Sequence, residues 1–81
     1  MTRKELMRKA IELSIENIAS GGGPFGAVIT RDGEIIATGV NRVTSEHDPT
    51  SHAEVNAIRN ASRNFFFNDT ATTEIYTSCQ P

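Results

Sequence analysis

Residues 48–54, with the sequence DPTSHAE, join a polar loop to a helix and place a histidine two residues before a glutamate. Proline fits the first turn of a helix, so Pro49–Ser51 predicts a helix start, and the helix runs to about Arg63. Residues two apart do not share a face of a regular helix, so His52 and Glu54 converge only if His52 lies at the first turn. The alternative is a Ser51–Glu54 capping box beside a solvated His52. Spacing alone leaves both interpretations open.

The chain before this stretch predicts a helix and a hairpin. Residues 2–19 have the three- and four-residue apolar spacing of an amphipathic helix, which Thr2 and Glu5 cap and the glycines and proline of residues 21–24 end. Asp32-Gly33 lies between the apolar runs 25–30 and 35–40, as in a type I′ hairpin. The apolar helix positions are Leu6, Met7, Ala10, Ile11, Leu13, Ile15 and Ile18.

The order of the remaining elements predicts an α/β layered domain. Residues 41–48 are polar and predict a loop, and Ile75–Thr77 predicts the start of a third strand. Both hairpin runs are almost continuously apolar, so we expect the sheet to be covered on both faces. Small apolar residues of the second predicted helix suit close packing on that sheet; they are Ala53, Ala57, Ile58 and Ala61.

Composition narrows the class of protein. The chain has 81 residues, 37% hydrophobic and 22% charged, which is typical of one small globular domain or a piece of one. A net charge of −2 disfavours nucleic acid as the main partner. The single cysteine, Cys79, excludes an internal disulfide, and charges spread through the first twenty residues leave no uncharged run for a secretory signal or a membrane span. We therefore expect a cytoplasmic location.

Residues 65–74 do not fit either periodicity. They contain three of the four phenylalanines, followed by a threonine-rich run. Residues 68–76 are what AAT GAT ACG GCG ACC ACC GAG ATC TAC encodes, and this string resembles a sequencing-library adapter. We therefore interpret residues 65–76 as resembling translated adapter, with a surface loop of unusual composition as the alternative. The genomic nucleotide sequence distinguishes the two.

His52-Ala53-Glu54 also matches half of a known chemical signature. His-x-Glu followed by Pro-Cys-x-x-Cys is typical of zinc nucleobase deaminases, in which the histidine and two cysteines bind zinc and the glutamate does not. Zinc lowers the pKa of bound water to about 7, which supplies a nucleophile at neutral pH. A neighbouring carboxylate can then move protons to the ring nitrogen and to the departing amine.

The sequence resembles the cytidine deaminase-like superfamily, with its CMP/dCMP-type deaminase domain, and within it the guanine deaminase and nucleoside deaminase branch. Residues 22–29 (GGPFGAVI), the Asp32-Gly33 turn, Asn41 and residues 48–59 (DPTSHAEVNAIR) occur in the family's order and spacing. The resemblance implies an α/β/α layered fold, truncated to a helix, a hairpin, a helix and a third strand. It further implies that residues 1–81 are the N-terminal part of one deaminase domain: 1–64 family-like, 65–74 anomalous and 75–81 leading into the zinc motif.

By this resemblance, His52 is a ligand of one Zn²⁺ and Glu54 is the catalytic proton shuttle. Asn41, Phe25 and Ala53 are substrate-binding, with Asn41 bonding the base and Phe25 packing at the pocket wall. A loop-capping Asn41 and a core Phe25 are the alternatives. Relatives that act on transfer RNA usually carry a smaller aliphatic residue between this proline and glycine, so Phe25 favours a free purine base.

The implied function is zinc-dependent deamination of a purine base or nucleoside, with guanine giving xanthine and ammonia, by a homodimer with no membrane partner. The alternatives are a tRNA-specific adenosine deaminase, another nucleoside or cytidine deaminase, and a non-catalytic binding or dimerisation module. Aligned with the family motif, Cys79 precedes the proline and is not a ligand, so both thiolate ligands would follow Pro81. A catalytic zinc needs three protein ligands. We therefore expect the 81-residue chain itself to be inactive.

Overall fold

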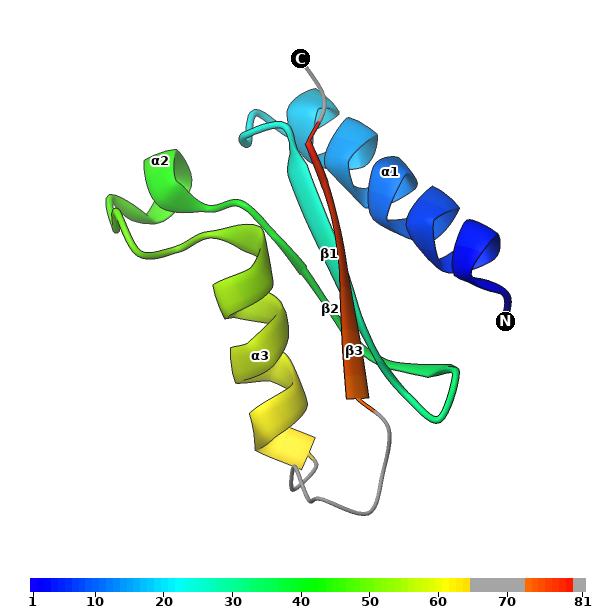
Figure 1. The fold of residues 1–81 in the computed structure, drawn as a ribbon. Helices are drawn as coiled ribbons and strands as arrows, with labels where there is room; N and C mark the ends of the chain where they lie inside the picture. Colours follow the sequence, from blue (N-terminus) through cyan, green and yellow to red (C-terminus); the bar gives the residue numbers. More distant parts are fainter. Residues whose placement is uncertain (65–72, 80–81) are drawn as a thin grey trace.

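The computed structural model describes residues 1–64 and 73–79, which form three layers. A sheet in the order β2-β1-β3 has antiparallel neighbours, with α1 against one face and α3 against the other (Figure 1). This arrangement confirms the predicted α/β/α fold and the sheet covered on both faces. The elements are α1 (Arg3–Ala19), β1 (Phe25–Arg31), β2 (Glu34–Val40), α2 (Val43–Glu46), α3 (Ala53–Asn64) and β3 (Thr73–Cys79).

The N-terminal helix α1 begins at the predicted capping box. The Glu5 amide donates to the Thr2 hydroxyl at 3.1 Å, and the Thr2 amide donates to the Glu5 carboxylate at 2.9 Å. These bonds lower the pKa of Glu5, since they favour its ionised form. The fully buried stripe of this helix is narrower than the predicted apolar set, because that set wraps further round the helix. Leu6, Ala10 and Ser14 are buried, whereas Ile15 and Ile18 are exposed.

Strands β1 and β2 form the predicted hairpin. Asp32 and Gly33 both have positive φ, 51° and 83°, as a type I′ turn requires. The register pairs Gly26 with Val40, and it shifts at a bulge between Ile29 and Thr30. Strand β1 is central, so side chains on both of its faces are buried.

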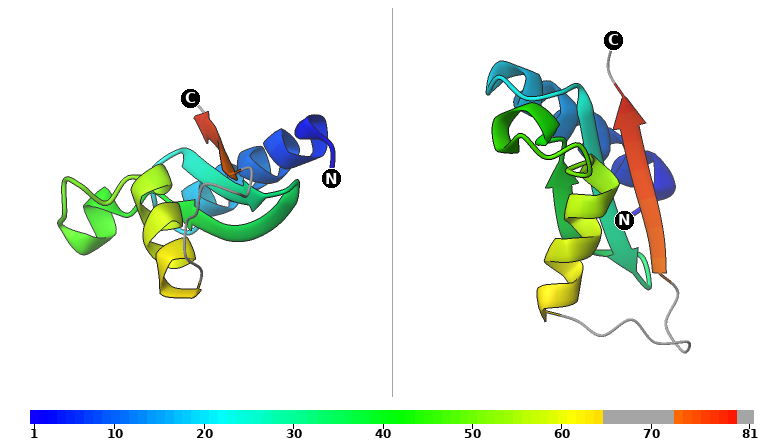
Figure 2. Two further views of the ribbon diagram at one scale, coloured as in Figure 1. Left: turned by 60° about the horizontal axis from the view of Figure 1, so that its bottom comes forward. Right: turned by 90° about the vertical axis from the view of Figure 1, so that its left-hand side faces the viewer.

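Helix α3 packs closely on the sheet through alanines. Ala53, Ala57 and Ala61 recur every four residues and form the core with Ala27 and Ile29 of β1. The helix also approaches β2, since a Cβ placed on Gly39 would lie 2.3 Å from the Ala57 nitrogen. The predicted burial of Ile58 is wrong: it is 40% exposed, because it lies one residue round the helix from this stripe. The right-hand view of Figure 2 shows α3 (yellow) in front of the sheet and α1 (blue) behind it.

Two boundaries differ from the sequence prediction. The predicted loop 41–48 contains the short helix α2. The residue that follows this helix, His47, has the left-handed backbone conformation, with φ 53°. Strand β3 begins at Thr73, two residues before the predicted Ile75, so the end of the anomalous segment is a strand that pairs with β1. Residues 65–72, on which most of the adapter interpretation falls, lie outside the described residues. Within the described ranges no helix is both long and apolar enough to cross a membrane.

Candidate active site

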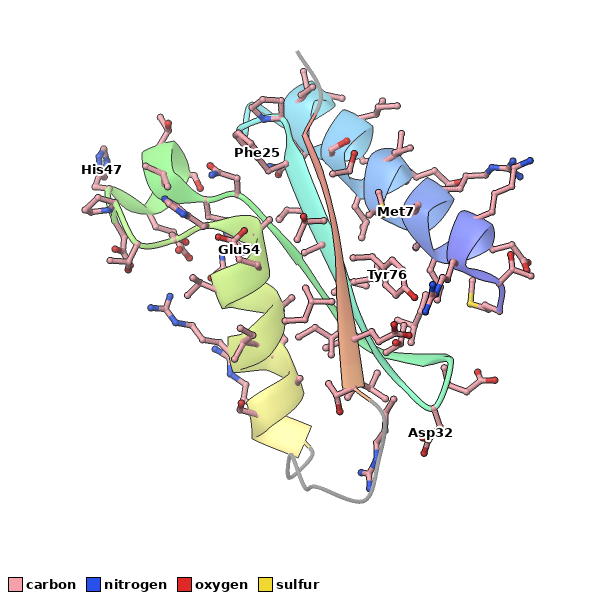
Figure 3. The ribbon with its side chains drawn as sticks, viewed as in Figure 1. Met7, Phe25, Asp32, His47, Glu54 and Tyr76 are labelled. Carbon is pink, nitrogen blue, oxygen red and sulfur yellow. The ribbon has the colours of Figure 1, made fainter. Side chains whose placement is uncertain are left out.

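One pocket of about 200 Å³ lies where the start of α3 faces the start of β1 and the end of β2. Figure 3 shows Phe25 at the start of β1 and Glu54 at the start of α3. The structure brings together every residue proposed from the sequence as catalytic, metal-binding or substrate-binding. The pocket is lined by Phe25, Asn41, His52, Ala53 and Glu54.

His52 and Glu54 converge at the beginning of α3. His52 precedes the first helical residue, Ala53, so its backbone is not bound to helical geometry. Its ring faces the Glu54 carboxylate. The His52 Nδ1 and Glu54 Oε1 atoms are 3.4 Å apart, and the two side chains are 54% and 45% exposed. Such an exposed pair adds little to stability. An imidazole and a carboxylate are therefore held side by side at the pocket mouth, accessible to a ligand.

The capping-box interpretation of Ser51 and Glu54 does not describe these contacts. The Ser51 hydroxyl donates to Glu46 Oε1 at 2.6 Å and accepts a hydrogen bond from Asn56 Nδ2 at 3.0 Å. Glu54 faces His52 instead of the helix start. Both side chains of the proposed box thus have other partners, and the Glu54 carboxylate lines the pocket beside His52.

Asn41 has contacts that fit both of its interpretations. Its Oδ1 accepts from the Val43 amide at 3.3 Å, a bond between residues two apart in the loop before α2, while the same side chain lines the pocket. Its backbone amide donates to the Phe25 carbonyl at 3.3 Å. Phe25 is 39% exposed, so the interpretation of this residue as a core phenylalanine is wrong.

Asn17 supports Asn41 from α1, and the sequence analysis missed it. Its Nδ2 donates to the carbonyls of Gly23 at 2.8 Å and Asn41 at 2.9 Å. A Cβ on Gly23 would lie 2.7 Å from the Asn41 Oδ1, so the glycine makes room for that side chain. These contacts fix the pocket wall next to Phe25. No local sequence pattern reveals them, because Asn17 and Asn41 are 24 positions apart.

Asp48 organises the turn that leads into His52. Its Oδ1 accepts from the Thr50 hydroxyl at 2.7 Å and the Thr50 amide at 2.9 Å. These bonds favour the ionised carboxylate and lower the pKa of Asp48 below its ordinary value. The turn is therefore stabilised above a pH of about 4, and this contribution is lost as the pH falls through the lowered pKa.

The donor set fits part of a zinc site. Among the residues that the structure describes, no group of three or more histidine, cysteine, aspartate and glutamate side chains converges, and His52 offers one imidazole where a catalytic zinc needs three protein ligands. The backbone of Cys79 pairs with Phe25, so β3 ends beside the pocket wall. The side chain of Cys79 lies outside the described part of the chain, and its exclusion as a ligand stays a prediction.

Comparison with known proteins defines the class. The whole chain, residues 1–81, matches the cytidine and deoxycytidylate deaminase zinc-binding region, and it belongs to this family. It is 46% identical to the guanine deaminase of Bacillus subtilis (strain 168) over 82 aligned residues, which cover all of this chain and 53% of that protein. The X-ray structure of guanine deaminase from Bacillus subtilis superposes with a TM-score of 0.85, over all of this chain and 52% of that one.

Two further relatives bind or act on purines. The structure of NE0047 in complex with 2,6-diaminopurine is 31% identical, with a TM-score of 0.79, and the match covers 94% of this chain and 44% of that chain. The tRNA-specific adenosine deaminase of Buchnera aphidicola subsp. Schizaphis graminum is 36% identical over 75 residues, covering 93% of this chain and 50% of that protein. The chain thus spans about half the length of the relatives it matches.

Proposed function

We propose that the protein containing this chain is a zinc-dependent hydrolytic deaminase that converts guanine and water into xanthine and ammonia. The observation that supports this proposal most is the pocket itself, in which His52 and Glu54 lie 3.4 Å apart opposite Phe25 and Asn41. The 46% identity to a guanine deaminase supports guanine as the substrate.

The pocket residues divide the work of this reaction. His52 supplies one ligand for zinc, which when bound activates water at neutral pH. Glu54 would accept a proton from the attacking water and pass it to the ring nitrogen, and would then accept the proton of the hydroxyl added to the ring carbon and pass it to the amine, which leaves as ammonia. The Asn41 carboxamide hydrogen-bonds the base and Phe25 packs against its ring, while the small Ala53 side chain leaves room between them.

The remaining zinc ligands must come from outside the described residues. Strand β3 runs toward the pocket and ends opposite Phe25, so residues that follow Cys79 would enter at the correct end of the sheet. The 81-residue chain has a single cysteine, and we expect it to bind zinc poorly and to show no turnover by itself. Metal analysis after purification measures the zinc.

We further propose that the intact protein is a cytoplasmic homodimer.

A tRNA-specific adenosine deaminase is the second candidate, because a relative of that class is 36% identical. Two observations favour a free base instead. The net charge of −2 disfavours a polyanion as the partner. Phe25 lines the pocket at the position where relatives that act on transfer RNA usually carry a smaller aliphatic residue.

Ammonia release from a panel of substrates tests the proposed function. The zinc-loaded protein that contains this chain is given guanine, adenosine, cytidine and transfer RNA. We expect guanine to have the highest kcat/KM, by about 100-fold or more, since the amine-bearing carbon and the hydrogen-bonding edge differ in the others. A higher kcat/KM for transfer RNA would favour the adenosine deaminase, and no release from any substrate would favour a non-catalytic binding module.

A further inference from the structure

One side chain joins the two segments that carry Asn41 and His52. The Asn56 Nδ2 donates to the Val40 carbonyl at 2.9 Å, to the Ser51 hydroxyl at 3.0 Å and, in a longer contact, to the Ser51 carbonyl at 3.3 Å. Val40 immediately precedes Asn41, and Ser51 immediately precedes His52. A single amide group of α3 therefore spans the end of β2 and the loop before the helix.

Further polar contacts surround this amide. Ser51 is fully buried, and its hydroxyl donates to Glu46 at 2.6 Å while its carbonyl accepts from the Arg42 amide at 2.8 Å. Glu46 also pairs with the Arg42 side chain at 3.5 Å. Because a buried hydroxyl without partners is costly, these bonds favour one position of Ser51. We call this set the Asn56 clamp; it comprises Val40, Arg42, Glu46, Ser51 and Asn56.

Asn60 makes a matched contact one helical turn away. Its Nδ2 donates to the Thr38 carbonyl at 2.8 Å. Four helical residues advance about 6 Å and two strand residues advance about 6.8 Å, so the two amides of α3 reach alternate carbonyls of the outer edge of β2. Both asparagines attach α3 to that edge. The Asn60 Oδ1 accepts a hydrogen bond at 3.1 Å from the side chain of Arg63, which lies on the same helix.

We infer that Asn56 is a positioning residue of the pocket, which holds Asn41 and His52 at a fixed separation without touching the substrate. This inference rests on the proposed function. Residues that orient metal ligands from behind typically change metal affinity or activity by about 10- to 100-fold when they are replaced. Asn56→Ala should therefore lower kcat/KM for guanine by about tenfold or more.

The test uses the intact, zinc-loaded protein that contains this chain and compares four forms of it: wild type, Asn56→Ala, the near-isosteric Asn56→Asp and the matched control Asn60→Ala. Asn56→Asp lacks both N–H donors but keeps the shape of the side chain. We expect both alanine variants to lose thermal stability, because each loses a bond to the edge of β2, and Asn56→Ala to lose more, because it also loses its contacts with Ser51. Only the two Asn56 variants should lower kcat/KM and speed hydrogen exchange of the Arg42 amide, by about tenfold.

Two results would overturn the inference. One is an Asn60→Ala variant that lowers kcat/KM and Arg42 protection as much as Asn56→Ala does, because Asn56 would then act only by attaching the helix. The other is unchanged kcat/KM in both Asn56 variants. If the wild type releases no ammonia from guanine, the proposed function fails. Hydrogen exchange of the Arg42 amide then still tests the clamp, and unchanged exchange in both Asn56 variants would show that the clamp does not exist.

Discussion

At the scale of single residues, Thr30 is a buried hydroxyl on β1 with no hydrogen-bond partner within the described part of the chain. Replacing it by valine removes an unpaired polar group and nearly preserves its shape. We expect Thr30→Val to raise the free energy of unfolding by about 1 kcal/mol, as measured by urea denaturation.

The matched control for this prediction is Val28→Thr, on the same strand face and also fully buried. It should lower the free energy of unfolding by about 1–3 kcal/mol, because it buries a new hydroxyl. If Thr30→Val destabilises the protein instead, the hydroxyl has a partner that these contacts do not include.

The pocket residues could be named from the sequence because they match positions of a known family, as His52-Ala53-Glu54 and Asn41 do. The residues that support them could not. Asn17 contacts Asn41 across 24 positions and Asn56 contacts Val40 across 16, so their roles arise only after α1 and α3 pack on the sheet. An isolated helical asparagine carries no local signal for such a contact.

At the scale of elements, Gly39 sets the distance between β2 and α3. A Cβ there would lie 2.3 Å from the Ala57 nitrogen and 2.4 Å from the Ala53 carbonyl oxygen, both backbone atoms that cannot move alone. Gly39→Ala should shift α3, cost about 1–3 kcal/mol of stability and change the NMR chemical shifts of the His52 and Glu54 amides.

Gly33→Ala is the control for this substitution. A Cβ at Gly33 meets nothing within 4 Å, and its cost of about 1–2 kcal/mol comes from the positive φ of 83°. It should leave the amide shifts of His52 and Glu54 unchanged. Equal shift changes in both variants would contradict a specific contact between Gly39 and α3.

The elements themselves were predictable where local chemistry decides them. The Thr2–Glu5 capping box and the Asp32-Gly33 turn follow from short-range hydrogen bonds and allowed φ, and both are confirmed. The exposure of Ile58 and the start of β3 at Thr73 were not predictable in this way. They depend on how α3 is rotated on the sheet and on pairing with Arg31 of β1.

At the scale of the whole molecule, antiparallel pairing gathers the pocket at one end of the sheet. The start of β1 pairs with the end of β2 through Gly26 and Val40, and with the end of β3 through Phe25 and Cys79. The sequence predicts these strands but not their order, because β3 pairs with β1 across about fifty residues. The order β2-β1-β3 brings the end of β3 to the same end of the sheet as His52 and Glu54.

The most direct test of the proton-shuttle role of this pocket is the rate of ammonia release from guanine by zinc-loaded protein carrying Glu54→Gln. The amide keeps the shape of the side chain and cannot accept the proton. We expect kcat to fall by at least about 100-fold relative to wild type at equal zinc content. A variant that retains more than about a tenth of wild-type kcat would contradict the assignment of Glu54 as the proton shuttle.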